Sequence, residues 1–196
     1  MILSHMISDA VLAATGVWVF ATAFRRVPFY SRLLWGFFFL TIALAALAGV
    51  FTFAGLTALE PLHSSLTTLA GSLGVVAVVV ATYATVLNRP LSPVSFSVTL
   101  GAGMLLFVGL FFPDVAVFAP VVAALGILLV MLLAVLALLQ KQQWAVWLVV
   151  AVMLMAFATK VQHLVLPLHP IDAYHYLIAI ALVAFGYAMR KREQTP

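Results

Sequence analysis

Three histidines and two aspartates are the side chains of this sequence whose types suit joint chemistry. His63, His163 and His175 supply imidazole nitrogens, and Asp9 and Asp172 supply carboxylates. Zinc is bound by such ligands, usually by three protein groups and a water molecule whose pKa the metal lowers. We therefore predict a zinc site formed by His63, His175 and one of Asp9, Asp172 or His163. Asp9 and Asp172 are the candidate catalytic carboxylates.

Asp172 and His175 form the most suggestive local pair because three residues separate them along the chain. In a helix this spacing puts the two side chains on neighbouring turns of one face, where a carboxylate can orient an imidazole or share a metal with it. Asp172 also has a purely structural interpretation. The helix macrodipole and the unpaired N–H groups stabilise any acid near a helix start. The same interpretation applies to the other acids near predicted helix starts, which are Asp9, Glu60 and Asp114.

The remaining polar groups near the predicted site also have structural interpretations. His63 follows Glu60 closely enough to belong to an interfacial helix cap, and His163 and His169 flank a proline-broken turn. Lys160 can extend its amine to lipid headgroups. His5 is predicted to lie in an N-terminal tail.

The elements that position these residues follow from composition. The chain has 196 residues, of which 66% are hydrophobic and 7% charged, a balance that excludes a water-soluble globular protein. A membrane-spanning helix needs roughly 20 apolar residues, so a chain of this length holds about seven. Proline, charged or amide residues divide it into seven apolar stretches. These are 7–24, 33–58, 61–87, 95–112, 114–139, 143–166 and 170–189. We predict an all-α protein, one domain over residues 1–196.

The basic residues predict the orientation of these seven helices. Eight of the nine lysines and arginines fall on one side of the predicted map, and only Lys160 falls on the other. Because short cytoplasmic loops carry excess positive charge, the N-terminus is predicted outside and the C-terminus in the cytoplasm. The eight are Arg25, Arg26, Arg32, Arg89, Lys141, Arg190, Lys191 and Arg192. Their scatter among short loops argues against nucleic-acid binding and favours contacts with lipid headgroups.

The candidate residues share faces with small residues, which is where membrane helices pack together. Asp9 aligns with Ala13 and Gly16, and His175 aligns with Ala179. We therefore predict a polar pocket inside the membrane that opens to the outer side. The absence of cysteine excludes thiolate metal sites and a cysteine nucleophile.

The seven short helices, the first-helix Asp9 and a last helix reading Ile171-Asp172-Ala173-Tyr174-His175 resemble the CREST superfamily. This group contains alkaline ceramidases, adiponectin-receptor-like proteins and haemolysin-III-like proteins. The resemblance implies an intramembrane zinc hydrolase of lipid amides or esters. His175 matches the family residue for residue, and Asp9 matches in kind and place. The sequence departs at Ile171, where the family has histidine, and its second predicted helix has no histidine.

Two functions therefore follow from the sequence. The first is a divergent metal-dependent lipid hydrolase of the bacterial inner membrane, acting on membrane lipids or a lipid-like small molecule. The alternative is a non-catalytic seven-helix protein that binds a lipid, a small ligand or a partner. Haem binding is disfavoured because no two histidines lie deep on facing helices.

Overall fold

Apolar runs separated by polar turns and prolines form the regular elements of the structure, a computed structural model that describes residues 2–161 and 167–194. All regular elements in these two ranges are helical. They are α1 (Ile2–Ala23), α2 (Phe29–Phe53), η1 (Thr57–Leu59), α3 (Glu60–Leu69), η2 (Ala70–Gly74), α4 (Val75–Val86), α5 (Pro93–Gly109), α6 (Pro113–Ala116), α7 (Ala119–Leu139), η3 (Gln143–Ala145), α8 (Val146–Ala158) and α9 (Pro170–Gln194).

Five helices in the described ranges are long and apolar enough to cross a membrane. They are Ile2–Ala23, Phe29–Phe53, Thr57–Val86, Ala119–Leu139 and Pro170–Gln194. Pro93–Gly109 and Gln143–Ala158 are apolar but shorter. These helices indicate an integral membrane protein, as composition predicts. Their bounds differ from the predicted stretches, most clearly at α1, which begins at Ile2, and at α8, which ends at Ala158.

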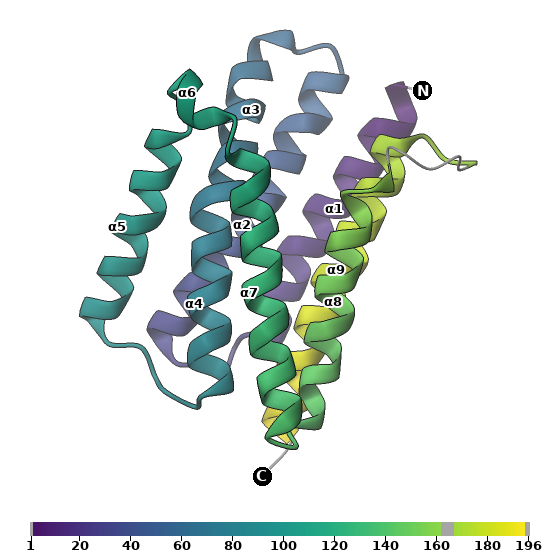
Figure 1. The fold of residues 1–196 in the computed structure, drawn as a ribbon. Coiled ribbons are helices and arrows are strands. Elements are labelled where there is room, and N and C mark those ends of the chain that lie inside the picture. Colours follow the sequence, from purple (N-terminus) through teal and green to yellow (C-terminus); the bar gives the residue numbers. More distant parts are fainter. Residues whose placement is uncertain (1, 162–166, 195–196) are drawn as a thin grey trace.

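The helices run alongside one another as a bundle, with α1 starting at one end and α9 finishing at the other (Figure 1). The α1–α2, α4–α5 and α7–α8 connections lie at the end where α9 finishes. We call this end the basic end because the eight basic residues of the predicted cytoplasmic side lie in or next to these segments. α1 packs between α2 and α9, while α5 lies at the edge of the bundle.

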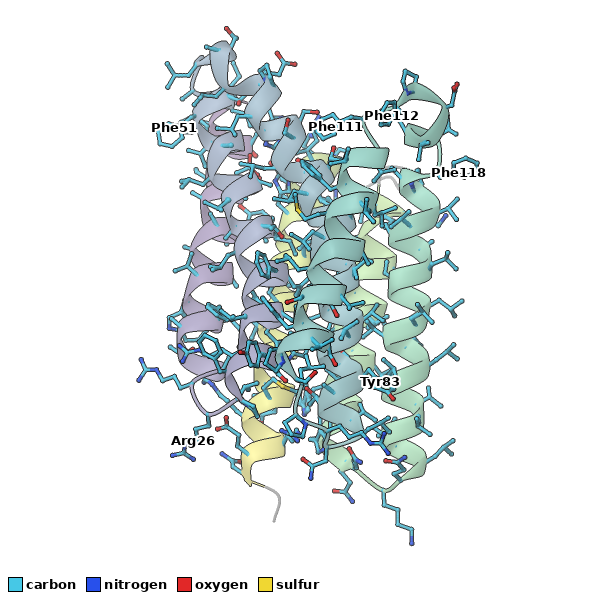
Figure 2. The ribbon with its side chains drawn as sticks, turned by 90° about the vertical axis from the view of Figure 1, so that its left-hand side faces the viewer. Arg26, Phe51, Tyr83, Phe111, Phe112 and Phe118 are labelled. Atoms are coloured by element: carbon cyan, nitrogen blue, oxygen red, sulfur yellow. The ribbon has the colours of Figure 1, made fainter. Side chains whose placement is uncertain are left out.

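Aromatic side chains fill the core between α1, α2 and α9. Phe24, Trp35, Phe39 and Phe185 are nearly inaccessible to solvent, and the ring centroids of Phe24 and Phe39 are 5.0 Å apart. By contrast, the outer faces of the bundle carry many exposed apolar side chains, as Figure 2 shows around Phe118. So much exposed apolar surface is what a lipid environment would cover.

Candidate functional site

A cavity of about 300 Å³ lies inside the bundle, toward the end opposite the basic end. It is lined by residues of α1, α2, the continuous helical segment formed by α3, η2 and α4, and by residues of α7, α8 and α9. Asp9, His63 and His175 all line it, so the structure brings these three predicted site residues together. Most of the other lining residues are apolar. The full set of other lining residues is Leu12, Phe38, Ile42, Ala45, Ala46, Thr67, Ala70, Gly71, Val75, Ala123, Ile127, Met155, Thr159, Tyr174 and Ile178.

Asp9 is the central polar group of this cavity. It is only 1% exposed, and neither of its carboxylate oxygens has a hydrogen-bond partner among the described residues. Its Oδ1 atom lies 3.2 Å from Nδ1 of His175. α1 begins at Ile2, which places Asp9 about two turns inside the helix. The expectation that a helix start stabilises this acid is therefore wrong, because the positive end of the macrodipole acts only within the first turn.

Gly49 of α2 lets Asp9 occupy its position. A Cβ atom built on Gly49 would collide with the carboxylate of Asp9 and would lie 3.2 Å from Cε1 of His63. The backbone of α2 therefore passes directly beside both side chains. Glycine is needed here because it has no Cβ atom, so that the helix and the carboxylate can come this close.

The hydrogen bonds of the two cavity histidines run through the Nδ1 atoms of their rings. Nδ1 of His63 donates to the carbonyl oxygen of Ala45 over 2.8 Å. Nδ1 of His175 lies 3.1 Å from Oγ of Ser8. Since a carbonyl oxygen can only accept, Nδ1 of His63 donates in this hydrogen bond, and in a neutral imidazole with this tautomer the other nitrogen, Nε2, is an acceptor. This leaves Nε2 of His63 as a group that can accept a hydrogen bond from a ligand.

Asp172 does not line the cavity but forms the centre of a neighbouring hydrogen-bond cluster. It is 1% exposed and accepts hydrogen bonds from the hydroxyls of Ser4 and Ser8 and from Nδ1 of His5. The Ser8 and His5 bonds to Oδ1 are both 2.8 Å long. Ser8 also contacts His175, so the two sets of polar residues join across α1 and α9. Asp172 lies in the first turn of α9, as the helix-start interpretation predicts.

His5 is a residue that sequence reasoning missed. It lies in α1, is 7% exposed, and has its ring centroid 4.5 Å from that of His169. The prediction of an N-terminal tail was wrong because the helix extends nearly to the start of the chain. One signal was available, since His5, Ser8 and Asp9 have the i, i+3, i+4 spacing of a single helix face.

Of the other two polar residues predicted near the site, the structure describes only Lys160, which does not line the cavity. Lys160 is exposed and follows the end of α8, where its backbone N–H bonds the carbonyl of Phe157. The sequence placed it about two turns inside a longer helix, and this was wrong. His163 lies outside the described residues, so its predicted role as a ligand stays a prediction.

A π-helical turn, η2, joins α3 to α4 and forms part of the cavity wall through Ala70 and Gly71. Such turns are often found at functional sites because the extra residue locally redirects the helix. Ser72 in this turn is fully buried, and its hydroxyl donates to the carbonyl oxygen of Thr68 over 2.7 Å. Hydrophobic patterning contains no signal for such an insertion.

Two further spaces share lining residues with the cavity. An apolar cavity of about 60 Å³ shares Phe38, Ile127 and Met155 with it and reaches Val130 and Phe185 in the core. A second hollow, of about 420 Å³, lies between the ends of α8 and α9. It shares three lining residues with the main cavity, which are Thr159, Tyr174 and His175. The polar residues of the main cavity therefore lie between the apolar cavity of about 60 Å³ and this hollow.

The arrangement of these side chains fits neither of two catalytic chemistries. Two imidazoles and a carboxylate are donor types that suit zinc. However, no three His, Asp, Glu or Cys side chains in residues 2–161 and 167–194 are placed to hold one metal ion. A Ser-His-Asp triad also does not fit, because Ser8 and Asp9 approach the same ring nitrogen of His175. A triad needs them on opposite nitrogens.

Residues 4–194 match a protein family described as a family of unknown function (DUF6962). The chain belongs to this family. The match covers every residue of the cavity and of the Asp172 cluster. No curated protein and no solved structure matches the chain. The description of the family names no activity and no ligand. The resemblance to the CREST superfamily stays a prediction.

Proposed function

We propose that this DUF6962 protein binds an amphipathic, lipid-like molecule in the Asp9 cavity. One observation carries the proposal: a buried carboxylate without a hydrogen-bond partner faces a largely apolar cavity. Ligand sites are commonly apolar cavities with a few convergent polar groups, and their volumes start at about 300 Å³. A buried carboxylate without a hydrogen-bond partner is costly even beside an imidazole, so a ligand that supplies hydrogen-bond donors gains free energy on binding.

The polar groups define the head of such a ligand. The Asp9 carboxylate only accepts hydrogen bonds, and Nε2 of an uncharged His63 ring whose Nδ1 donates to Ala45 accepts one as well. A head that donates, such as an amine or a hydroxyl, suits both. The apolar cavity of about 60 Å³ that reaches Val130 and Phe185 suits an alkyl chain. The favoured ligand class is therefore a long-chain amine or alcohol, including the amino alcohols and hydroxylated lipids of membranes.

The binding test uses two photo-crosslinking probes that share one alkyl chain. The first has a free amino-alcohol head, and the second has the same head with amine and hydroxyls blocked by methylation and acetylation. We expect the first probe to label peptides that contain cavity residues, and excess unlabelled amino alcohol to prevent this. Equal labelling by both probes, or labelling confined to the outer faces of the bundle, would overturn the proposal.

The zinc hydrolase predicted from the sequence is the second candidate. It is favoured by the meeting of Asp9, His63 and His175 at one cavity, although these side chains would have to rearrange to hold a metal. Elemental analysis of protein purified from zinc-supplemented cells separates the candidates. About one zinc per chain, lost in a variant with His63 and His175 replaced by alanine, would favour the hydrolase. Metal-free protein that still binds the amino-alcohol probe would favour simple binding.

The proposal includes seven membrane spans, with the N-terminus outside and the C-terminus in the cytoplasm of a bacterial inner membrane. The basic end then faces the cytoplasm, in agreement with the excess of positive charge there. A reporter fused after Pro196, or inserted beside Arg89, should be cytoplasmic. A reporter at Met1 or beside Asp114 should be external. An external C-terminal reporter would contradict both the orientation and the number of spans.

A further inference from the structure

A second concave site lies at the basic end, far from Asp9 along the bundle. It is a groove of about 410 Å³ between the α1–α2 connection, the α4–α5 connection and the last turns of α9. Pro28, Ser31, Asn88, Arg89 and Arg192 are among its lining residues. None of the described residues that line it is acidic. It is therefore a site with positive charge on its walls, separate from the Asp9 cavity.

The groove contains the start of α2, and this helix start has no side-chain cap. Pro28 occupies the N-cap position and offers no side-chain hydrogen bond. The backbone N–H of Arg32 is paired with the carbonyl oxygen of Pro28 at 2.8 Å. The N–H groups of the preceding helical residues have no partner within the helix, and the helix macrodipole adds partial positive charge there. Such an uncapped start attracts an anion.

The hydroxyl of Ser31 gives an independent sign of a ligand. Ser31 is only 4% exposed and lines the groove, yet its hydroxyl forms no hydrogen bond within the part of the chain that the structure describes. Thr85, on another wall of the same groove, donates to the carbonyl oxygen of Ala81 over 2.7 Å. The oxygen of the Ser31 hydroxyl is itself accessible from the groove, unlike the fully buried, unpaired hydroxyl oxygen of Thr82. The hydroxyl of Ser31 is therefore a donor that a bound group can satisfy.

Two guanidinium groups complete the site. Nη2 of Arg192 donates to Oδ1 of Asn88 over 2.9 Å, which fixes the Arg192 side chain across the groove between α9 and the α4–α5 connection. Asn88 has a φ of 50°, a left-handed conformation that asparagine tolerates better than most residues, so its position at the end of α4 suits its type. Arg89 follows directly and lines the groove as well.

We propose that this groove binds a phosphate group, carried by an anionic membrane lipid or present as free phosphate. Planar guanidinium groups match phosphate oxygens in a bidentate geometry, and the helix N–H groups and the Ser31 hydroxyl add further donors. A carboxylate has fewer oxygens to satisfy this many donors. The site does not depend on the function proposed for the Asp9 cavity.

The test measures binding in maltoside micelles, which contain no phosphate. Short-chain phosphatidylglycerol and inorganic phosphate are added separately at constant ionic strength, and binding is followed by native mass spectrometry and melting temperature. We expect one of the two to bind and to raise the melting temperature. Binding of phosphatidylglycerol alone identifies a lipid headgroup, and binding of inorganic phosphate identifies the free ion. No binding of either would overturn the proposal.

Variants then locate the site. Arg89→Gln and Arg192→Gln should each weaken binding roughly tenfold or more, because each removes a charge-assisted hydrogen bond. Ser31→Ala should weaken it less and leave the fold intact, because it breaks no internal hydrogen bond. Arg26→Gln is the matched control, since Arg26 is at the same end, does not line the groove and extends outward in Figure 2. Equal losses in Arg26→Gln and Arg89→Gln would show only nonspecific attraction and overturn the site.

Discussion

Replacing Asp9 by alanine is expected to raise the melting temperature of the protein while lowering its affinity for the amino-alcohol probe. The carboxylate is 1% exposed and has no hydrogen-bond partner among the described residues, so its burial destabilises the ligand-free protein. In the complex it accepts charge-assisted hydrogen bonds, which contribute about 1.5–3 kcal/mol each. The expected loss of affinity is therefore roughly tenfold to a hundredfold. Functional residues commonly lower stability in this way.

Two further variants test whether this effect belongs to the cavity. Gly49→Ala should also weaken probe binding, because the added methyl group displaces the carboxylate of Asp9, but it should not raise the melting temperature. Asp114→Ala is the matched control, because Asp114 is an exposed acid in the short helix α6. Competition with the crosslinking probe gives affinity, and thermal unfolding in micelles gives stability. A less stable Asp9→Ala protein with unchanged binding would show that Asp9 has a structural role.

Replacing Asp172 by alanine is expected to have the opposite effect on stability. This carboxylate accepts hydrogen bonds from Ser4, Ser8 and His5, and alanine removes all three bonds, although Ser8 keeps the carbonyl oxygen of His5 as an acceptor at 3.0 Å. Single hydrogen bonds between membrane helices contribute about 0.6 kcal/mol on average. Losing three of them at a buried, charged acceptor should lower the free energy of unfolding by roughly 2 kcal/mol or more.

The free energy of unfolding is measured by titration with sodium dodecyl sulfate in mixed micelles. Asp172→Asn is the conservative comparison, because its amide oxygen can still accept from one or two of the donors. We expect its stability to lie between that of the wild type and that of Asp172→Ala. An Asp172→Ala protein as stable as the wild type would contradict a structural role for the cluster. The two buried acids thus separate by experiment into a binding group and a structural group.

The two acids also show where sequence reasoning was limited. Both acids lie near predicted helix starts, so stabilisation by the helix macrodipole was the predicted structural explanation for both. In the structure this argument holds for Asp172, in the first turn of α9, and fails for Asp9, inside α1. The difference comes from the start of α1 at Ile2, which hydropathy placed near residue 7. A polar residue such as His5 lowers the apparent hydropathy of a segment even when the helix buries it against another helix.

The sequence by itself determined the membrane class, the helical architecture and the polar breaks between helices. These depend on composition and on proline and charge at given positions, because a bilayer leaves no other way to satisfy the backbone. The sequence also indicated that Asp9, His63 and His175 face inward. Only the tertiary structure decided their partners, the inclusion of His5 and Ser8, the π-helical turn and the groove at the start of α2. These depend on the rotation and depth at which α1, α2 and α9 pack, and the near-uniform apolar surfaces of such helices leave rotation and depth to side-chain packing.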